Sequence, residues 1–285
     1  MRIVWLLCLA ACVEQPSLST TSSASTVGDH EGDGCSTTVV LGLSRQIAEQ
    51  AGCSDPNSFI TLEDVSGLTF DEAVLPFLMR DAHDALAHVA ATSLLEVSSA
   101  LRTVPQQYLL YQWYLQGRCG ITAAATPGTS NHEGGRAVDL DNYAEQIDAM
   151  AAAGWIHDVP GDDVHFDHTS SADDRGQDVA AFQTLWNANY PDDAIAEDGV
   201  YGPETEARLV LAPASGFAIG PSCTTPPPWP SSDVSGGPHE VESSATPTDA
   251  AVGCDAGGAG ALAMSVPSLC LVVRRRRRYR RVGSK

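Results

Sequence analysis

The sequence predicts an α+β fold, in which a small antiparallel sheet with flanking helices is followed by a small helical unit. Two observations support this prediction. Segments with the apolar spacing of helices stand apart from a few short segments in which apolar and polar residues alternate, as in half-buried strands. After residue 171, two further helical segments flank an acidic turn, "DGVYGPET", and the second of them begins near Pro203.

The predicted elements of the first unit follow in order along the chain. Apolar residues recur at helical spacing from Phe70 to about Ala91. "LEVSSALR" (95–102) alternates and suits a strand, and Pro105 then takes a first-turn position in a helix over 105–117. "AVDLD" (137–141) and "DVHFDH" (163–168) predict two more short strands, separated by a helix over 142–154.

The N-terminus has the features of an exported protein. "MRIVWLLCLAAC" (1–12) places one basic residue before a short apolar run, which predicts a secretory signal. Its last four residues resemble a lipobox in which Cys12 would carry lipid, and a plain signal cleaved slightly later is the alternative. Residues 13–34 are rich in Ser, Thr and Gly and predict a flexible tether, whereas Pro-rich residues 216–252 predict a disordered linker.

The last segment, 253–285, resembles the sorting tails of myxobacterial surface proteins. A Gly–Cys pair ending at Cys254 precedes a weakly apolar stretch and then an arginine cluster from Arg274. By the positive-inside rule, these arginines would stay in the cytoplasm while the rest of the chain is exported. We therefore expect a monomer in the periplasm or at the cell surface, anchored to a membrane through Cys12 or through the tail.

Between its two ends the chain is strongly acidic. The sequence holds 36 acidic and 16 basic residues, and only seven arginines and no lysine lie between Ile3 and Val273. An anionic surface does not attract nucleic acid, and the terminal arginines adjoin an apolar segment instead of forming a folded basic face. We therefore expect no nucleic-acid partner.

Four cysteines lie between the signal and the sorting tail. An even number of cysteines in an exported protein predicts disulfide bonds, here two. Three pairings are possible, and proximity in the sequence favours Cys35–Cys53 together with Cys119–Cys223.

Three side chains on or beside the two later strands are candidates for a metal site. In "SNHEGGRAVDLD", His132 and Asp139 flank two glycines that permit a tight bend, and Asp139 alternates with apolar neighbours, so it projects from one face of its strand. His165 alternates with apolar neighbours in the same way on the other strand. Zinc in hydrolases is usually held by three nitrogen or oxygen side chains, with a further position open to water, and these three residues fit that requirement.

These residues also resemble two motifs of the zinc peptidases of peptidoglycan, a family that includes D-alanyl-D-alanine carboxypeptidases and L-alanyl-D-glutamate endopeptidases. The first motif is Ser-x-His-x-x-Gly-x-Ala-x-Asp, and the second is an acid, two residues, then His and an aromatic. The resemblance covers roughly residues 95–168. The matching residues are Ser130, His132, Gly135, Ala137 and Asp139 in the first motif, and Asp162, His165 and Phe166 in the second.

The resemblance implies a role for each residue. Arg102, in "SALR", is the counterpart of an arginine that binds a substrate carboxylate. Ser130 is expected to contact substrate, to hydrogen-bond within its own loop, or to steady a ligand. By position, His132, Asp139 and His165 are the implied zinc ligands, and Asp162 is the implied general base.

Several alternatives remain open at these positions. Asp163 could be the acid in place of Asp162, and Arg102 could form a structural salt bridge instead of binding substrate. The three metal-site residues could also be ordinary polar side chains. An aspartate as the base slightly favours the endopeptidase branch of the family, since many members have a glutamate there.

The later unit resembles a peptidoglycan-binding repeat, in which a helix with Leu/Phe-Gln precedes Asp-Gly-x-Tyr/Phe-Gly-Pro-x-Thr and another helix. The usual closing helix is absent after Leu211, and Tyr201 is the one candidate for a binding side chain. The agreeing residues are Phe182, Gln183, Leu185, Asp198, Gly199, Tyr201, Gly202, Pro203 and Thr205.

The sequence thus predicts a zinc peptidase domain over 35–170 and a wall-binding-like unit over 171–215. The expected function is zinc-dependent cleavage of peptidoglycan stem peptides, of the carboxypeptidase or the endopeptidase type. The alternative is a zinc-containing cell-wall-binding protein without catalytic activity.

Overall fold

The computed structural model describes residues 24–32, 34–56 and 58–223, which belong to one compact unit. The predicted signal, the predicted sorting tail and most of the predicted linker lie outside these residues. None of the helices in the described part is long and apolar enough to cross a membrane.

A four-stranded sheet has the strand order β2-β4-β5-β6, and its last two strands carry the predicted ligands Asp139 and His165. β4 (Leu95–Ser99), β5 (Ala137–Leu140) and β6 (His165–Asp167) are antiparallel neighbours, but β2 (Leu68–Phe70) runs parallel to β4. The α+β class is therefore confirmed, whereas the expectation of a purely antiparallel sheet is wrong. A parallel pair needs a crossover connection, and the chain between β2 and β4 supplies one through helix α2 (Arg80–Ala90).

The helix predicted from Phe70 begins only at Arg80. Pro76 explains the difference, since proline lacks an N–H for the helix ladder and disfavours helical geometry in the residue before it. The residues before α2 instead form β2 and, at Phe77–Leu78, β3, which pairs with β1 (Ile60–Thr61) in a small antiparallel sheet.

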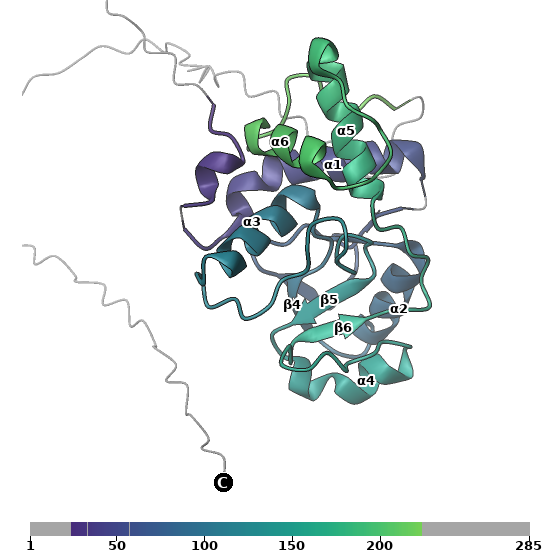
Figure 1. The fold of residues 1–285 in the computed structure, drawn as a ribbon. Coiled ribbons are helices and arrows are strands. Elements are labelled where there is room, and N and C mark those ends of the chain that lie inside the picture. Colours follow the sequence, from purple (N-terminus) through teal and green to yellow (C-terminus); the bar gives the residue numbers. More distant parts are fainter. Residues whose placement is uncertain (1–23, 33, 57, 224–285) are drawn as a thin grey trace, which may run out of the picture. The chain divides into compact units, whose positions relative to one another are not determined.

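Four helices enclose the larger of two apolar cores. They are α1 (Leu41–Ser54), α3 (Val104–Leu115), α5 (Gln177–Asn189) and α6 (Pro203–Leu211), and Figure 1 shows them gathered above the sheet. Three of them match predicted segments, but α1 was not predicted. The buried side chains include Leu43 and Ile47 of α1, Leu109 and Trp113 of α3, Phe182, Leu185 and Trp186 of α5, and Leu209 of α6.

The sheet has one apolar face, which α2 and α4 (Ile147–Ala152) cover. Val97 of β4 packs in this smaller core, yet Ser99 two residues later contacts Arg102 and His132 instead. Residues two apart on a regular strand share a face, and the register shift between Val97 and Ser99 resolves this conflict. The other face of the sheet is therefore left for polar side chains.

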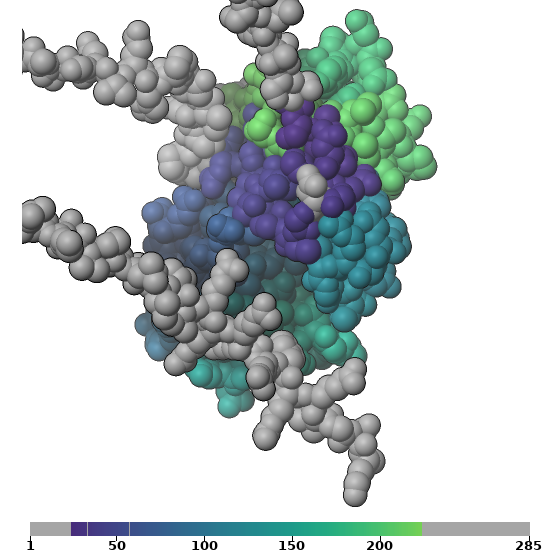
Figure 2. Space-filling view, turned by 90° about the vertical axis from the view of Figure 1, so that its left-hand side faces the viewer, coloured from purple at the N-terminus to yellow at the C-terminus, as the bar shows by residue number. Residues whose placement is uncertain are grey.

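Parts of the predicted tether and linker pack into the fold. The backbone N–H of Val27 donates to the carbonyl of Ala212 (2.9 Å), and that of Ala214 donates to Ser25 (2.9 Å). Val27 and Phe217 are buried in the larger core. In Figure 2 the purple N-terminal residues accordingly lie against the green C-terminal ones.

Between the described cysteines two disulfide bonds form, as predicted, but the favoured pairing is wrong. Cys35 pairs with Cys119, with Cα atoms 5.5 Å apart, and Cys53 pairs with Cys223 at 4.9 Å. Cys53 is near the C-terminal end of α1, where the chain after Phe217 returns: Ser222 donates its N–H to Gln50 of the same helix (3.2 Å). Proximity in the sequence failed because tertiary packing brings Cys119 to Cys35 and Cys223 to Cys53, across sequence separations of 84 and 170 residues.

Candidate metal centre

The register of β5 and β6 brings two of the predicted ligands together. Asp139 lies directly opposite His165 in this antiparallel pair, so both side chains leave the sheet on the same face. Val138 and Phe166, their neighbours on the two strands, point into the apolar core on the other face. The alternation seen in the sequence thus sets the direction of both ligands.

His132 reaches the same place from the tight loop before β5. The loop closes when Gly135 donates its N–H to the carbonyl of His132 (3.0 Å), and Gly135 has φ +63°. A Cβ atom at Gly135 would lie 2.9 Å from Cδ1 of Phe59, so only glycine fits both the backbone and the space. The N–H of Arg102 also donates to the carbonyl of His132 (3.2 Å), which anchors the loop to the segment after β4.

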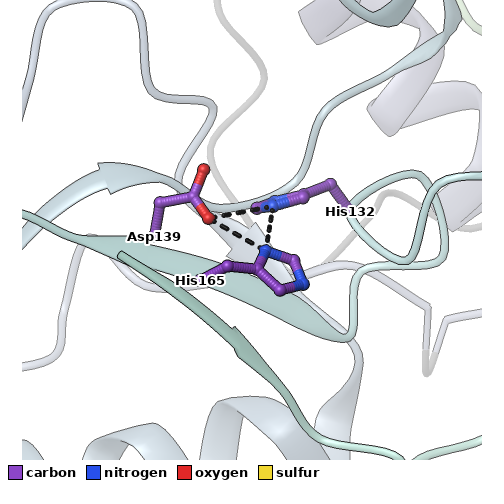
Figure 3. A group of neighbouring side chains, drawn as sticks. All are labelled: His132, Asp139 and His165. Carbon is purple, nitrogen blue, oxygen red and sulfur yellow. Dashed lines mark hydrogen bonds and ion pairs between the residues drawn. The ribbon is translucent and has the colours of Figure 1, made fainter. Parts of the chain in front are cut away.

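The three side chains converge on one point (Figure 3). Nε2 of His132 lies 3.2 Å from Nδ1 of His165 and 3.2 Å from Oδ1 of Asp139, and the last two atoms are 3.0 Å apart. The ligand atoms of a tetrahedral zinc ion, with bonds of about 2.0–2.1 Å, lie roughly 3.3 Å apart. Among the described residues this is the one group of His, Cys, Asp and Glu that could hold a metal ion.

The hydrogen bonds at the far side of each ring also fit a metal site. Nδ1 of His132 lies 2.8 Å from the carbonyl oxygen of Ala100, and Nε2 of His165 lies 3.1 Å from Oδ1 of Asp167. Both oxygens only accept, so each of these nitrogens carries the proton. In a neutral ring the opposite nitrogen then has a free lone pair, and in both histidines this is the nitrogen that faces Asp139.

The charged groups of the cluster shift one another's pKa values. Burial and the nearby Arg102 guanidinium lower the pKa of His132. Burial alone would also lower the pKa of His165, but its hydrogen bonds to Asp139 and Asp167 outweigh this and raise the pKa to about 10. Burial would raise the pKa of Asp139, but the two histidines and Arg102 hold it well below its usual range.

Arg102 lies beside Asp139, and its guanidinium, which the sequence predicts to bind substrate, contacts protein side chains. Its NH2 group donates to Ser99 (3.1 Å) and lies 3.3 Å from Oδ2 of Asp139, and its NH1 group donates to Gln107 (3.0 Å). Arg102 therefore orients the carboxylate of Asp139, one of the three candidate ligands. The structural salt bridge left open by the sequence is present, and substrate binding by the remaining N–H groups stays a prediction.

Ser130 hydrogen-bonds within its own loop. Its Oγ accepts from the N–H of His132 (3.3 Å), and its own N–H donates to Oε2 of Glu133 (3.0 Å). Glu133, which was not predicted, also accepts from the N–H of Gly128 (2.7 Å). Burial raises the pKa of Glu133 to about 7, although these N–H groups oppose the shift.

Asp162 lies in the turn just before β6 and is exposed. Its carbonyl accepts from the N–H of His165 (3.3 Å), but within the described part of the chain its carboxylate makes no hydrogen bond or ion pair. Asp163 is exposed as well, and its carbonyl accepts from Nε2 of His157 (2.7 Å). The choice between these two acids stays open, and Asp162 remains the predicted base.

The sequence reasoning missed the supporting residues Asp167, Asn131 and Ser99. Asp167 had a signal, since it follows His165 by two positions on a strand and must share its face. Asn131 and Ser99 had none, because Asn131 lies in the loop before β5 and the direction of Ser99 depends on the register shift in β4.

No protein-family model, curated protein or solved structure matches this chain. The likeness to the peptidoglycan peptidases therefore stays a prediction from the motif residues, and the geometry shows that His132, Asp139 and His165 could hold a metal ion.

Proposed function

We propose that this protein is a zinc-dependent peptidase that cleaves the stem peptides of peptidoglycan, either as a D-Ala-D-Ala carboxypeptidase or as an L-Ala-D-Glu endopeptidase. The convergence of His132, Asp139 and His165 on one point, within 3.2 Å of one another, is the observation that supports this function. Two nitrogen donors and one carboxylate form a donor set that zinc hydrolases use.

Zinc bound there would polarise a substrate carbonyl and lower the pKa of a bound water to about 7. The exposed Asp162 carboxylate would take the proton of that water and pass it to the leaving amine. Arg102 would hold Asp139 in place and direct any N–H group left free by its protein partners at a substrate carboxylate.

A second candidate function is binding of the cell wall without cleavage. A cavity of about 160 Å³ lies among the residues that resemble the peptidoglycan-binding repeat. Its lining includes Gln183, Asp198, Gly202 and Thr205, which are motif positions. Among the described residues no group holds the exposed Asp162 carboxylate in place, which also favours this candidate.

Incubation of the full chain with purified muropeptides, with zinc or with a chelator, tests the proposal by the masses of the products. Loss of D-Ala identifies a carboxypeptidase, and a split after L-Ala identifies an endopeptidase. No change of mass under any metal condition contradicts the enzymatic function and favours wall binding.

The variant Asp162→Ala identifies the base, with Asp163→Ala as its matched control on the neighbouring exposed acid. We expect Asp162→Ala to bind zinc and to lose about 10²–10⁴-fold in rate, the range of general acid–base catalysis. Loss of activity in Asp163→Ala alone would assign the base to Asp163.

A further inference from the structure

We propose that Asp167 is a positioning residue that fixes the ring of His165 for metal binding, and that Asn131 holds Asp167 for this task. The inference rests on the proposed metal centre and adds to it two residues that neither peptidase motif specifies. It does not depend on which bond, if any, the protein cleaves.

The position of Asp167 follows from the strand. It comes two residues after His165 on β6, so its side chain lies on the same face of the sheet as the ligand. Its Oδ1 lies 3.1 Å from Nε2 of His165, while Nδ1 of the same ring lies 3.0 Å from Oδ1 of Asp139. The carboxylate therefore contacts the side of the ring that faces away from the metal position, so it supports a ligand and is not one itself.

Asn131 fixes the orientation of this carboxylate. Its Nδ2 donates to Oδ1 of Asp167 (2.9 Å), and its Oδ1 accepts from Nε of Arg136 (3.1 Å). Arginine can only donate, so the amide oxygen must face Arg136 and the amide nitrogen must face Asp167. Arg136 is held in turn by Asp173, at 3.6 Å.

This chain of contacts also links the two histidine ligands. Asn131 immediately precedes His132 in the metal-binding loop, and its side chain reaches the carboxylate that supports His165. The loop and β6 are thereby fixed relative to each other. Carboxylates that accept from a metal-bound histidine set its orientation and increase its basicity, and their loss typically weakens metal binding about 10- to 100-fold.

The two ligand histidines differ in a way that makes the proposal testable. The carbonyl of Ala100 supports His132, and no substitution removes a backbone carbonyl. A side chain supports His165, so a variant can remove it. Asp141 offers a matched control, since it follows the ligand Asp139 by two positions but is exposed.

The experiment measures the zinc dissociation constant of the full chain by competition with a chromophoric chelator. We expect Asp167→Ala to weaken zinc binding about 10- to 100-fold and Asp167→Asn to weaken it less, because the amide oxygen still accepts a hydrogen bond. Asp141→Ala should stay within about twofold of the wild type, as expected of an exposed residue. The visible spectrum of the cobalt-loaded protein should change in Asp167→Ala and not in Asp141→Ala.

Equal zinc affinities and equal cobalt spectra in Asp167→Ala and the wild type would overturn the proposal, as would an equal loss in Asp141→Ala. If Asp167→Ala does not fold, Asn131→Ala provides the same test, with a loss in the same direction expected. The two proposals can fail separately. If the wild type leaves muropeptides intact while Asp167→Ala loses zinc affinity, the peptidase function is contradicted and this inference is supported. A chain that cleaves muropeptides but keeps its zinc affinity in Asp167→Ala supports the peptidase function and contradicts this inference.

Discussion

At the scale of single residues, His165 of the candidate metal centre lies between two acidic side chains. Two carboxylates, Asp139 and Asp167, flank its ring at 3.0 and 3.1 Å. Without metal they stabilise a protonated ring, and its pKa rises to about 10. A metal ion needs the lone pair on Nδ1, so binding must displace that proton.

We therefore predict that zinc binding at pH 8 releases about one proton from His165. Calorimetric titration in two buffers of different ionisation enthalpy measures this release, and the half-exposed His157 supplies the control variant His157→Gln, which should release as many protons as the wild type. An apparent enthalpy that is the same in both buffers contradicts the prediction.

The same shift predicts how the stability of the metal-free protein depends on pH. A histidine whose pKa is higher in the folded state stabilises the fold fully below its unfolded pKa, near 6.5, and this contribution disappears as pH rises toward 10. The free energy of unfolding should fall across this window by up to about 1.4 kcal/mol per pH unit. Urea unfolding of the metal-free protein at several pH values measures the slope, and a flat profile contradicts the account.

Asp178, near the start of α5, is a second unusual residue. It is fully buried, and neither of its carboxylate oxygens has a hydrogen-bond partner in the described part of the chain. Burial, together with the nearby Glu133, raises its pKa well above the usual value. A carboxyl group whose pKa is higher in the folded state stabilises the fold while it is protonated. The stabilisation by Asp178 is therefore complete below about pH 4 and is lost as pH rises.

We predict that Asp178→Asn removes part of the loss of stability between pH 4 and pH 8, because the amide does not ionise. Urea unfolding at both pH values checks this, with the exposed Asp192→Asn as the control. The prediction is wrong if Asp178→Asn and the control show the same change of unfolding free energy between the two pH values.

At the scale of elements, the loop from Ser130 to Arg136 determines whether His132 reaches the sheet. Gly135 is its critical position, since it has φ +63° and has no room for a Cβ atom. Gly117 has the same φ of +63° but open space around it. A substitution at Gly117 therefore measures the cost of the left-handed backbone without a steric clash.

We predict that both Gly117→Ala and Gly135→Ala cost about 1–2 kcal/mol from the left-handed backbone. Gly135→Ala should cost about 1–3 kcal/mol more through its clash with Phe59, and it should also weaken zinc binding. Chemical unfolding and chelator competition measure the two effects. Equal costs at the two glycines would show that the space around Gly135 is not restrictive.

Most of the site could be predicted from the sequence because strand alternation sets the direction of side chains. That rule placed Asp139 and His165 correctly, and the geometry brings His132 to them as the motif implied. Strand alternation says nothing about residues outside strands. Arg102 follows β4 and Asn131 precedes β5, so the partners of their side chains were not predictable. The fold before Arg80 was misjudged because apolar spacing outweighed Pro76, and β2, which makes the sheet mixed, was missed with it.

At the scale of the whole molecule, the segment after residue 171 does not have a core of its own. Phe182 and Trp186 of α5 pack in the same cluster as Leu43 and Ile47 of α1. The Cys53–Cys223 disulfide also joins α1 to the end of the described chain. The predicted boundary at residue 170 therefore crosses a shared core, although whether 171–215 binds wall polymer stays a prediction.

We predict that Phe182→Ala destabilises the entire described unit by about 3–5 kcal/mol, the usual cost of removing a buried phenylalanine. Leu211→Ala, at a position that is 60% exposed at the end of α6, should change stability by less than about 0.5 kcal/mol. Thermal unfolding should show one transition that moves as a whole in Phe182→Ala. Two separate transitions, of which only one moves, would contradict the shared core.

The most direct test of the metal centre is a crystal structure of the zinc-loaded protein with anomalous diffraction recorded at the zinc absorption edge. The account predicts one strong peak bonded to Nε2 of His132, Oδ1 of Asp139 and Nδ1 of His165. No peak at these three atoms, or a peak held by other residues while they remain hydrogen-bonded to one another, would contradict it.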